Sequence, residues 1–133
     1  MLYDGLCGAC NRAVGFILTR DPVGGMRFAP LQGRFAEQLF ARYPALRSVD
    51  SLLLVRQSGV DDAEHVSVRS AAVVEVGHYL GGIWRLVAGV LRLVPRALRD
   101  WCYDAFAQRR GRLFGRYDSC PVPAPEVRAR FIE

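Results

Sequence analysis

The sequence of 133 residues contains no lysine, so all 18 of its basic residues are arginine. Genome composition alone can produce this bias without any function. Internal repeats and low-complexity segments are also absent, which argues against a repetitive or disordered chain. The most apolar late stretch, residues 79–94, is interrupted by Arg85, Arg92 and a Gly-Gly pair and is too short to span a bilayer. We expect it to form a buried or interfacial helix.

No basic and apolar leader precedes the first structural signals, because a short strand pattern and a Cys-x-x-Cys motif both occur by Cys10. This predicts a protein without a secretory signal. Four cysteines in such a chain indicate redox-active, metal-binding or core residues rather than a disulfide framework. We therefore expect a cytoplasmic, reducing environment.

The formal net charge of +5 is unevenly distributed. Eight arginines fall within residues 85–116, where Asp100 and Asp104 are the only acidic residues. We interpret this stretch as a solvated basic face with a few ion pairs. Peripheral contact with a membrane and contact with an acidic partner remain alternatives, and nucleic acid is the least favoured of them.

Hydrophobic residues make up 51% of the chain and charged residues 23%, which predicts one globular domain over residues 1–133. Periodicity predicts a strand at 1–3, a helix from the motif to Asp21, a strand at 26–30 and a helix at 35–43. A buried strand at 52–55 and a strand at 66–68 follow, and then a helix to residue 80 that Ser70 caps. Extra helices are expected at about 83–110, as segments 84–94 and 96–109, with an extended tail at about 117–133.

The predicted order is βαβαββα followed by additional helices. Parallel strands joined through helices, with a terminal antiparallel hairpin, give a mixed β-sheet flanked by helices on both faces. This is the α/β arrangement of the thioredoxin-like fold, although periodicity alone also permits other small α/β sandwiches.

The Cys7-x-x-Cys10 motif lies where the first strand becomes the first helix. A helix N-terminus stabilises a thiolate, so Cys7 is the candidate nucleophile. Cys10, three residues later, is the candidate resolving thiol, and we expect it to be the less exposed of the two because it shares the apolar stripe of Val14 and Ile17. Asp4 either accepts a proton from Cys10 during resolution or caps the turn.

A Cys-x-x-Cys motif is also half of a zinc site, but the second half is missing here. Cys102 lies on a helical stripe with Leu98 and Ala105, and we expect it to be a buried core residue. Cys120 has two possible roles: a structural one, or that of a third thiol that folds back onto the motif.

Several blocks of the sequence, in order along nearly the whole chain, resemble the DCC family of predicted thiol-disulfide oxidoreductases. The blocks are Tyr3-Asp4-Gly5-Leu6-Cys7-Gly8-Ala9-Cys10-Asn11, Pro30-Leu31-Gln32, Asp50-Ser51, Arg69-Ser70-Ala71-Ala72, Pro95, Arg99-Asp100, Tyr103-Asp104, and Arg110 through Phe114-Gly115-Arg116 to Cys120. Cys102 falls outside them. The resemblance implies a thioredoxin-like fold and redox activity.

In thioredoxins, by the same resemblance, a cis-proline occupies the position that Asp50-Ser51 holds here. An acidic Asp50 near Cys7 would oppose thiolate formation, and a nearby Arg69, Arg110 or Arg116 would favour it. The residues expected to bind substrate or support the thiolate are therefore Asp50, Ser51, Arg69, Ser70, Arg110, Arg116 and Cys120.

These observations favour a thiol-disulfide oxidoreductase that needs no cofactor. Cys7 would attack a substrate disulfide, Cys10 would release the product, and a separate reductant would restore the dithiol. Two alternatives remain. One is a metal-binding or metal-delivery module that uses the motif and a third ligand such as Cys120, and the other is a non-catalytic domain that docks its basic helices on a membrane or partner.

Overall fold

Within the part of the chain that the structure describes, four short strands form one mixed sheet in the order β2-β1-β3-β4. The computed structural model describes residues 1–21, 23–49, 51–57 and 64–132. Strand β1 (Leu2–Tyr3) pairs in parallel with β2 (Ala29–Pro30) and antiparallel with β3 (Leu53–Gln57). Strands β3 and β4 (Glu64–Val68) form an antiparallel pair. The predicted α/β class, a thioredoxin-like mixed sheet flanked by helices, is confirmed.

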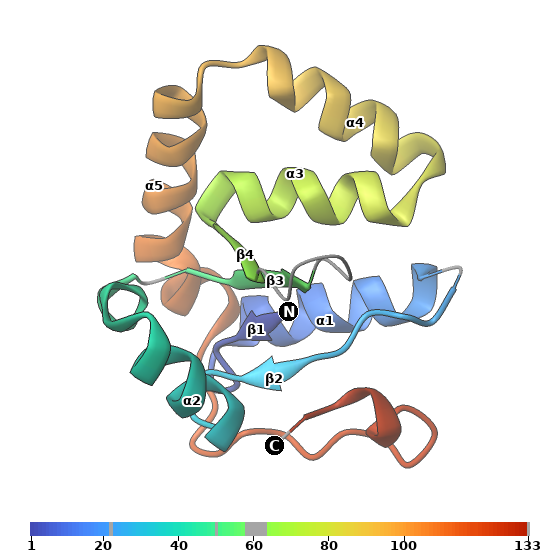
Figure 1. Ribbon diagram of the computed structural model, residues 1–133, viewed down its shortest axis with the longest axis vertical. Helices are drawn as coiled ribbons and strands as arrows, with labels where there is room; N and C mark the ends of the chain where they lie inside the picture. The colour runs from blue at the N-terminus through green and yellow to red at the C-terminus, as the bar shows by residue number, and fades with distance from the viewer. Residues whose placement is uncertain (22, 50, 58–63, 133) are drawn as a thin grey trace.

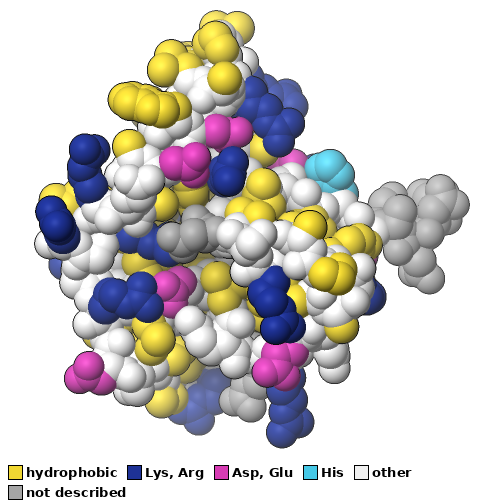
Figure 2. Space-filling model, turned by 90° about the vertical axis from the view of Figure 1, so that its left-hand side faces the viewer, with side chains coloured by type: hydrophobic (Ala, Val, Ile, Leu, Met, Phe, Trp, Pro, Cys, Tyr) yellow, Lys and Arg dark blue, Asp and Glu magenta, His cyan; other side chains and the backbone are white. Residues whose placement is uncertain are grey.

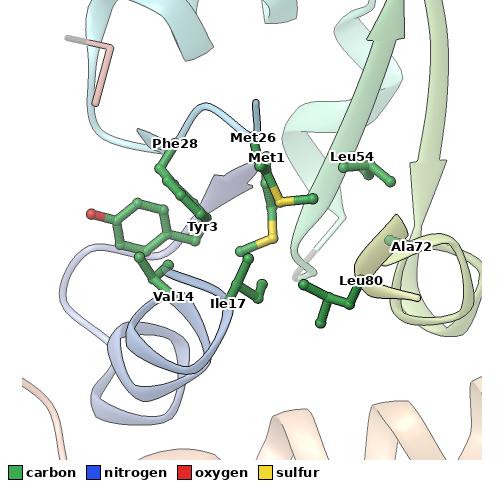
Figure 3. Packing of buried hydrophobic residues seen from close by; sticks show 9 residues of the cluster. All are labelled: Met1, Tyr3, Val14, Ile17, Met26, Phe28, Leu54, Ala72 and Leu80. Carbon is green, nitrogen blue, oxygen red and sulfur yellow. The ribbon is translucent and has the colours of Figure 1, made fainter. Parts of the chain in front are cut away.

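Alternation along the strands divides the core between the two faces of the sheet. One cluster packs around Tyr3, Phe28 and Leu54, with Val14 and Ile17 contributed by the first helix. Figure 3 shows these side chains converging, with the hydroxyl of Tyr3 pointing away from the other labelled residues. The neighbouring residues in each strand belong to a second cluster on the opposite face, which contains Leu2, Ala29, Ala36, Leu39 and Leu53.

Of the α-helices in the described residues, three cover the sheet and two extend the fold. Helices α1 (Gly8–Arg20) and α3 (Arg69–Leu80) contribute to the first cluster, and α2 (Arg34–Arg42), which the short 3₁₀ helix Pro44–Ser48 follows, contributes to the second. Helix α4 (Gly82–Leu93) lies across α3, and α5 (Arg96–Phe114) runs from the end of α4 back to the start of α1 (Figure 1). Within the described residues, no helix combines the length and apolar character needed to cross a membrane.

Some element boundaries differ from the predictions. The second strand is Ala29–Pro30 rather than 26–30, although Met26 and Phe28 are buried as expected. Helix α3 begins one residue before Ser70, with Val68 as its N-cap, and the Ser70 hydroxyl instead donates to Asp100 on α5. Helix α5 is also longer than expected, because the polar positions after residue 109 still propagate a helix.

Cys102 is exposed, so the expectation that it is a core residue is wrong. The stripe containing Leu98 and Cys102 faces outward, because α5 is attached to the rest of the fold through other residues. The Tyr103 hydroxyl oxygen accepts the backbone N–H of Leu52 at 3.1 Å, and Arg110 is the one buried residue of the helix.

The tail after α5 contains no α-helix, and its only regular element among the described residues is the 3₁₀ turn Arg128–Arg130. Its last part lies along the outer edge of β2. There Phe28 donates its N–H to Arg130 O at 2.8 Å and Ile132 donates its N–H to Phe28 O at 2.7 Å.

Candidate active site

Cys7 occupies the N-cap of α1, at the expected junction between strand and helix. Its extended backbone ends the turn after β1, and its carbonyl accepts the N–H of Asn11 at 3.0 Å. The backbone N–H of Cys10 donates to the Cys7 sulfur at 3.4 Å. The Cys7 sulfur therefore lies at the positive end of the α1 dipole and accepts a backbone N–H there.

Cys10 lies one turn further along, and its sulfur retains a proton. Burial, and after it the hydrogen bond to Cys7 and the negative charge of Cys7, raise the pKa of Cys10 to about 12. The charge of Arg110 and a hydrogen bond from the Asp4 backbone act in the opposite direction. The geometry therefore pairs a Cys7 sulfur that receives hydrogen bonds with a Cys10 thiol that donates one.

The relative exposure of the two cysteines is the reverse of the prediction. Cys7 is 1% exposed, whereas Cys10 is half-buried. The residues that cover Cys7 come from the end of α5 and the segment after it, residues 114–117, which we call the strap. In the strap, Arg116 forms a β-bridge with Cys7, and Tyr117 donates its N–H to Leu6 O at 2.7 Å.

Two glycines bring the strap against the motif. Gly115 adopts a positive φ of 74° at the end of α5, which lets the chain reverse direction there. Gly8 donates its N–H to Gly115 O at 3.1 Å. A Cβ on Gly8 would lie 2.2 Å from the carbonyl oxygen of Phe114, so the strap can approach this closely only because residue 8 has no side chain.

Asp4 is buried at the centre of a polar network beside the two cysteines. One carboxylate oxygen accepts the N–H of Leu6 at 3.0 Å and the side-chain amide of Gln32 at 2.9 Å. The other oxygen lies 3.5 Å from Arg116 and 3.9 Å from Arg110. Asp4 therefore holds the turn, as one of its two predicted roles requires, and also connects the turn to α5 and the strap.

Gln32 and Asn11 belong to this network, and neither was singled out as a site residue from the sequence. Gln32 accepts the N–H of Gly5 at 3.2 Å, in addition to its bond with Asp4. The parallel pairing of β1 with β2 brings the residues after both strands to the same edge of the sheet, which is a signal that could have identified Gln32. Asn11 donates to the carbonyls of Gly5 and Cys7, both at 2.9 Å, and so fixes the turn to the helix.

Cys120 folds back toward the motif. A Cβ on Gly5 would lie 2.5 Å from the Cys120 sulfur, which places this thiol against the turn that carries the active-site motif. Burial, and after it the charge of Cys120, a hydrogen bond with Cys120 and the charge of Cys10, raise the pKa of Tyr3 to about 12. The Tyr3 hydroxyl is thus close to both sulfurs, while Cys120 itself remains exposed.

The other expected residues lie further along the same elements. Ser51 accepts the N–H of Arg69 at 2.6 Å and so joins the start of β3 to the start of α3. The Arg69 guanidinium lies 3.5 Å from Asp104, and Ser70 contacts Asp100, so both connect α3 to α5. Asp50 lies outside the described residues. The structure thus brings Asp4, Arg110, Arg116 and Cys120 to the two cysteines, and uses Ser51, Arg69 and Ser70 in contacts between elements.

A metal site that uses the motif would need further ligands. Among the residues that the structure describes, no three His, Cys, Asp or Glu side chains gather in a way that could hold a metal ion. Cys120 does not complete such a group with Cys7 and Cys10.

Known proteins resemble this chain in sequence along most of its length. A family model described as DCC1-like thiol-disulfide oxidoreductase matches residues 1–116. The uncharacterized protein YuxK of Bacillus subtilis is 34% identical over 99% of this chain and 92% of its own length. A chloroplastic DCC family protein of Arabidopsis thaliana is 31% identical over 92% of this chain and 68% of its own length. No solved structure gives a significant match.

Proposed function

The chain belongs to the DCC1-like thiol-disulfide oxidoreductase family, and from that premise we propose that it exchanges disulfides through Cys7 and Cys10. The observation that carries the proposal is the pairing of the two sulfurs across the first turn of α1. The Cys7 sulfur accepts an N–H at the helix N-terminus, and Cys10 holds its proton beside it. The substrate class is a disulfide of a protein or of a small thiol.

The reaction proceeds in two displacements. The Cys7 thiolate attacks one sulfur of the substrate disulfide, so a Cys7–substrate disulfide forms and the other substrate sulfur leaves as a thiolate. Cys10 then loses its proton and attacks the Cys7 sulfur, which gives a Cys7–Cys10 disulfide and releases the second substrate thiolate. The substrate gains two electrons and the dithiol loses two, and an external dithiol or thiol reductant returns them.

Exposure and ionisation point to different cysteines as the attacking group. Cys10 is the more exposed of the two, but burial and the neighbouring Cys7 raise the pKa of Cys10 to about 12, so its thiol keeps its proton near neutral pH. Cys7 is therefore the nucleophile, and the strap has to move away from Cys7 before a substrate disulfide can reach it.

The test is the formation of a reversible bridge between the two cysteines. The protein is equilibrated with mixtures of reduced and oxidised dithiothreitol, and the remaining thiols are alkylated. The masses of the tryptic peptides are then measured. Because Cys7 and Cys10 lie before Arg12 on one peptide, a bridge between them lowers the mass of that peptide by about two hydrogens and prevents its alkylation.

Cys102, exposed on the outer face of α5, provides the control, and Cys102→Ser should leave the equilibrium unchanged. A peptide that stays fully alkylatable under oxidising mixtures would refute the proposal. So would a bridge that forms only between separate molecules.

Asp4→Asn separates the two roles of this carboxylate. Asparagine keeps the oxygen that accepts the N–H of Leu6 but loses the charge that faces Arg110 and Arg116. If Asp4 accepts the proton of Cys10 during resolution, we expect turnover to fall by about 10²-fold, as for a lost general base. The free energy of unfolding should fall by only ~1–3 kcal/mol, because the hydrogen bond of the turn is retained.

Asp4→Ala is the comparison for this substitution, since it removes both the charge and the hydrogen bond. We expect it to match Asp4→Asn in turnover and to be less stable in urea denaturation. Turnover of Asp4→Asn equal to that of the unmodified protein would leave Asp4 with the turn role alone.

A further inference from the structure

The outer face of α4 and the start of α5 carry a row of exposed apolar side chains. We call this surface the α4 patch, and its members are Ile83 (67% exposed), Leu86 (71%), Val90 (64%), Leu93 (84%), Leu98 (51%) and Trp101 (68%). The four residues on α4 are spaced at intervals of three and four, so they share one face of the helix. Figure 2 shows hydrophobic side chains gathered at the top of the molecule, the end that α4 occupies in Figure 1.

The opposite side of α4 packs against the protein, so the α4 patch faces solvent. Ala88 is 2% exposed, and a Cβ on Gly77 of α3 would lie 2.9 Å from the Ala88 Cβ, so the two helices touch there. Trp84 packs edge-to-face on Phe16 of α1, with ring centres 4.8 Å apart. The patch is therefore the second apolar face of a helix whose first apolar face is already used.

Both charged residues of α4 are positive. Helix α4 contains Arg85 and Arg92 and no acidic residue, and Arg96 follows at the start of α5. All three arginines are exposed. The nearest acidic side chain in sequence, Asp100, is half-buried and is engaged by Ser70 and Arg96.

This combination distinguishes between the possible occupants of the patch. A second copy of the chain would cover the apolar row but would bring two arginine-rich surfaces together, which is unfavourable. A membrane that contains anionic phospholipid would cover the same row and neutralise the arginines. Trp101 at the rim of the patch matches the preference of tryptophan for the interface between headgroups and acyl chains.

We propose that the α4 patch docks this protein on the surface of an anionic phospholipid membrane. Helix α4 lies in the plane of the interface, with Ile83, Leu86, Val90 and Leu93 among the upper acyl carbons, and the guanidinium groups of the neighbouring arginines reach the phosphates. The inference is independent of the exchange chemistry of Cys7 and Cys10, because the two surfaces share no residue.

The test is co-sedimentation of the reduced protein with two kinds of vesicle, one of phosphatidylcholine alone and one of phosphatidylcholine mixed with phosphatidylglycerol. We expect binding to the mixed vesicles that is at least tenfold stronger and that weakens at raised salt. Leu86→Ser/Val90→Ser should bind the mixed vesicles at least tenfold more weakly than the unmodified protein does, because the variant lacks two of the apolar side chains that insert among the acyl chains.

Val23→Ser/Val122→Ser is the matched control, since both valines are at least as exposed but lie outside the patch, and it should bind as the unmodified protein does. Arg85→Gln/Arg92→Gln should lose the preference for phosphatidylglycerol, whereas Arg34→Gln on α2 should keep it. All variants alter exposed side chains, and circular dichroism with a thiol titration checks that each is folded.

Three outcomes would overturn the proposal. The first is no binding to either vesicle, and the second is equal binding to both. The third is sedimentation of the protein as a dimer that dissociates in the Leu86→Ser/Val90→Ser variant. This result would assign the α4 patch to a second copy of the chain.

Discussion

Replacing Cys7 with serine is expected to lower the rate of disulfide exchange by at least about 10³-fold, to the background of the thiol reductant. A serine hydroxyl is not ionised near neutral pH, so neither the helix N-terminus nor the N–H of Cys10 has an anion to stabilise. The remaining thiol of the motif cannot substitute for Cys7, because burial keeps the pKa of Cys10 well above the neutral range. The measurement is the reduction of a disulfide-linked fluorogenic peptide under excess dithiothreitol.

Cys10→Ser should behave differently from Cys7→Ser. Cys7 still attacks, but nothing within the motif resolves the product, so a mixed disulfide with the substrate should accumulate and be visible by mass spectrometry. Equal loss in both variants with no trapped species, or a trapped species on Cys10 in the Cys7→Ser variant, would contradict the assignment of roles.

The second large effect is expected from Gly8→Ala. The added Cβ would lie 2.2 Å from Phe114 O and 3.0 Å from Gly115 O, and neither is a flexible side-chain atom that can move aside. The strap therefore has to shift, at a cost of roughly 1–3 kcal/mol. Each ~1.4 kcal/mol lost from the contact makes the open form about tenfold more populated, so Cys7 should react with iodoacetamide about ten to a hundred times faster.

Gly15→Ala is the control in the same helix, because a Cβ there meets nothing within 4 Å. It should leave the alkylation rate unchanged and stabilise the protein by roughly 0.5–1 kcal/mol through its higher helix propensity. If Gly8→Ala alkylates no faster than Gly15→Ala, the strap is not what limits access to Cys7.

The sequence predicts those parts of the fold that depend on local pattern. The spacing of Val14 and Ile17 predicts α1, the run at residues 52–55 predicts β3, and the turn before Cys7 predicts that the motif starts a helix. Each of these features is determined by neighbours within a few positions. The order of elements then leaves few ways to assemble a mixed sheet, which is why the α/β class could be predicted.

The burial of Cys7 could not be predicted in the same way. It depends on backbone pairing between residues 6–8 and the strap, more than 100 positions later, and backbone hydrogen bonds leave little trace in side-chain pattern. Gly8 and Gly115 carry the only local signal, and the same glycines are compatible with an open motif. The resemblance of Arg110 and Arg116 to family positions does indicate that this region approaches the motif, and both arginines do lie beside Asp4.

The outward orientation of α5 was missed for a related reason. Leu98, Cys102 and Ala105 form an apolar stripe that predicts an inner face, but the contacts that attach α5 are polar ones made by Tyr103, Asp100 and Arg110. Periodicity identifies an apolar face but does not determine what covers it. On α4 the same pattern occurs twice around one helix, and only one of the two apolar faces contacts the protein.

The last described residues of the chain, which run beside β2, also affect how the molecule meets its neighbours. A strand at the rim of a sheet offers unpaired amide and carbonyl groups on which a further strand can add. Here the outward N–H of Phe28 bonds to the carbonyl of Arg130, and the outward carbonyl of Phe28 bonds to the N–H of Ile132. The tail thereby occupies the backbone groups at this rim on which a strand of another molecule could otherwise add.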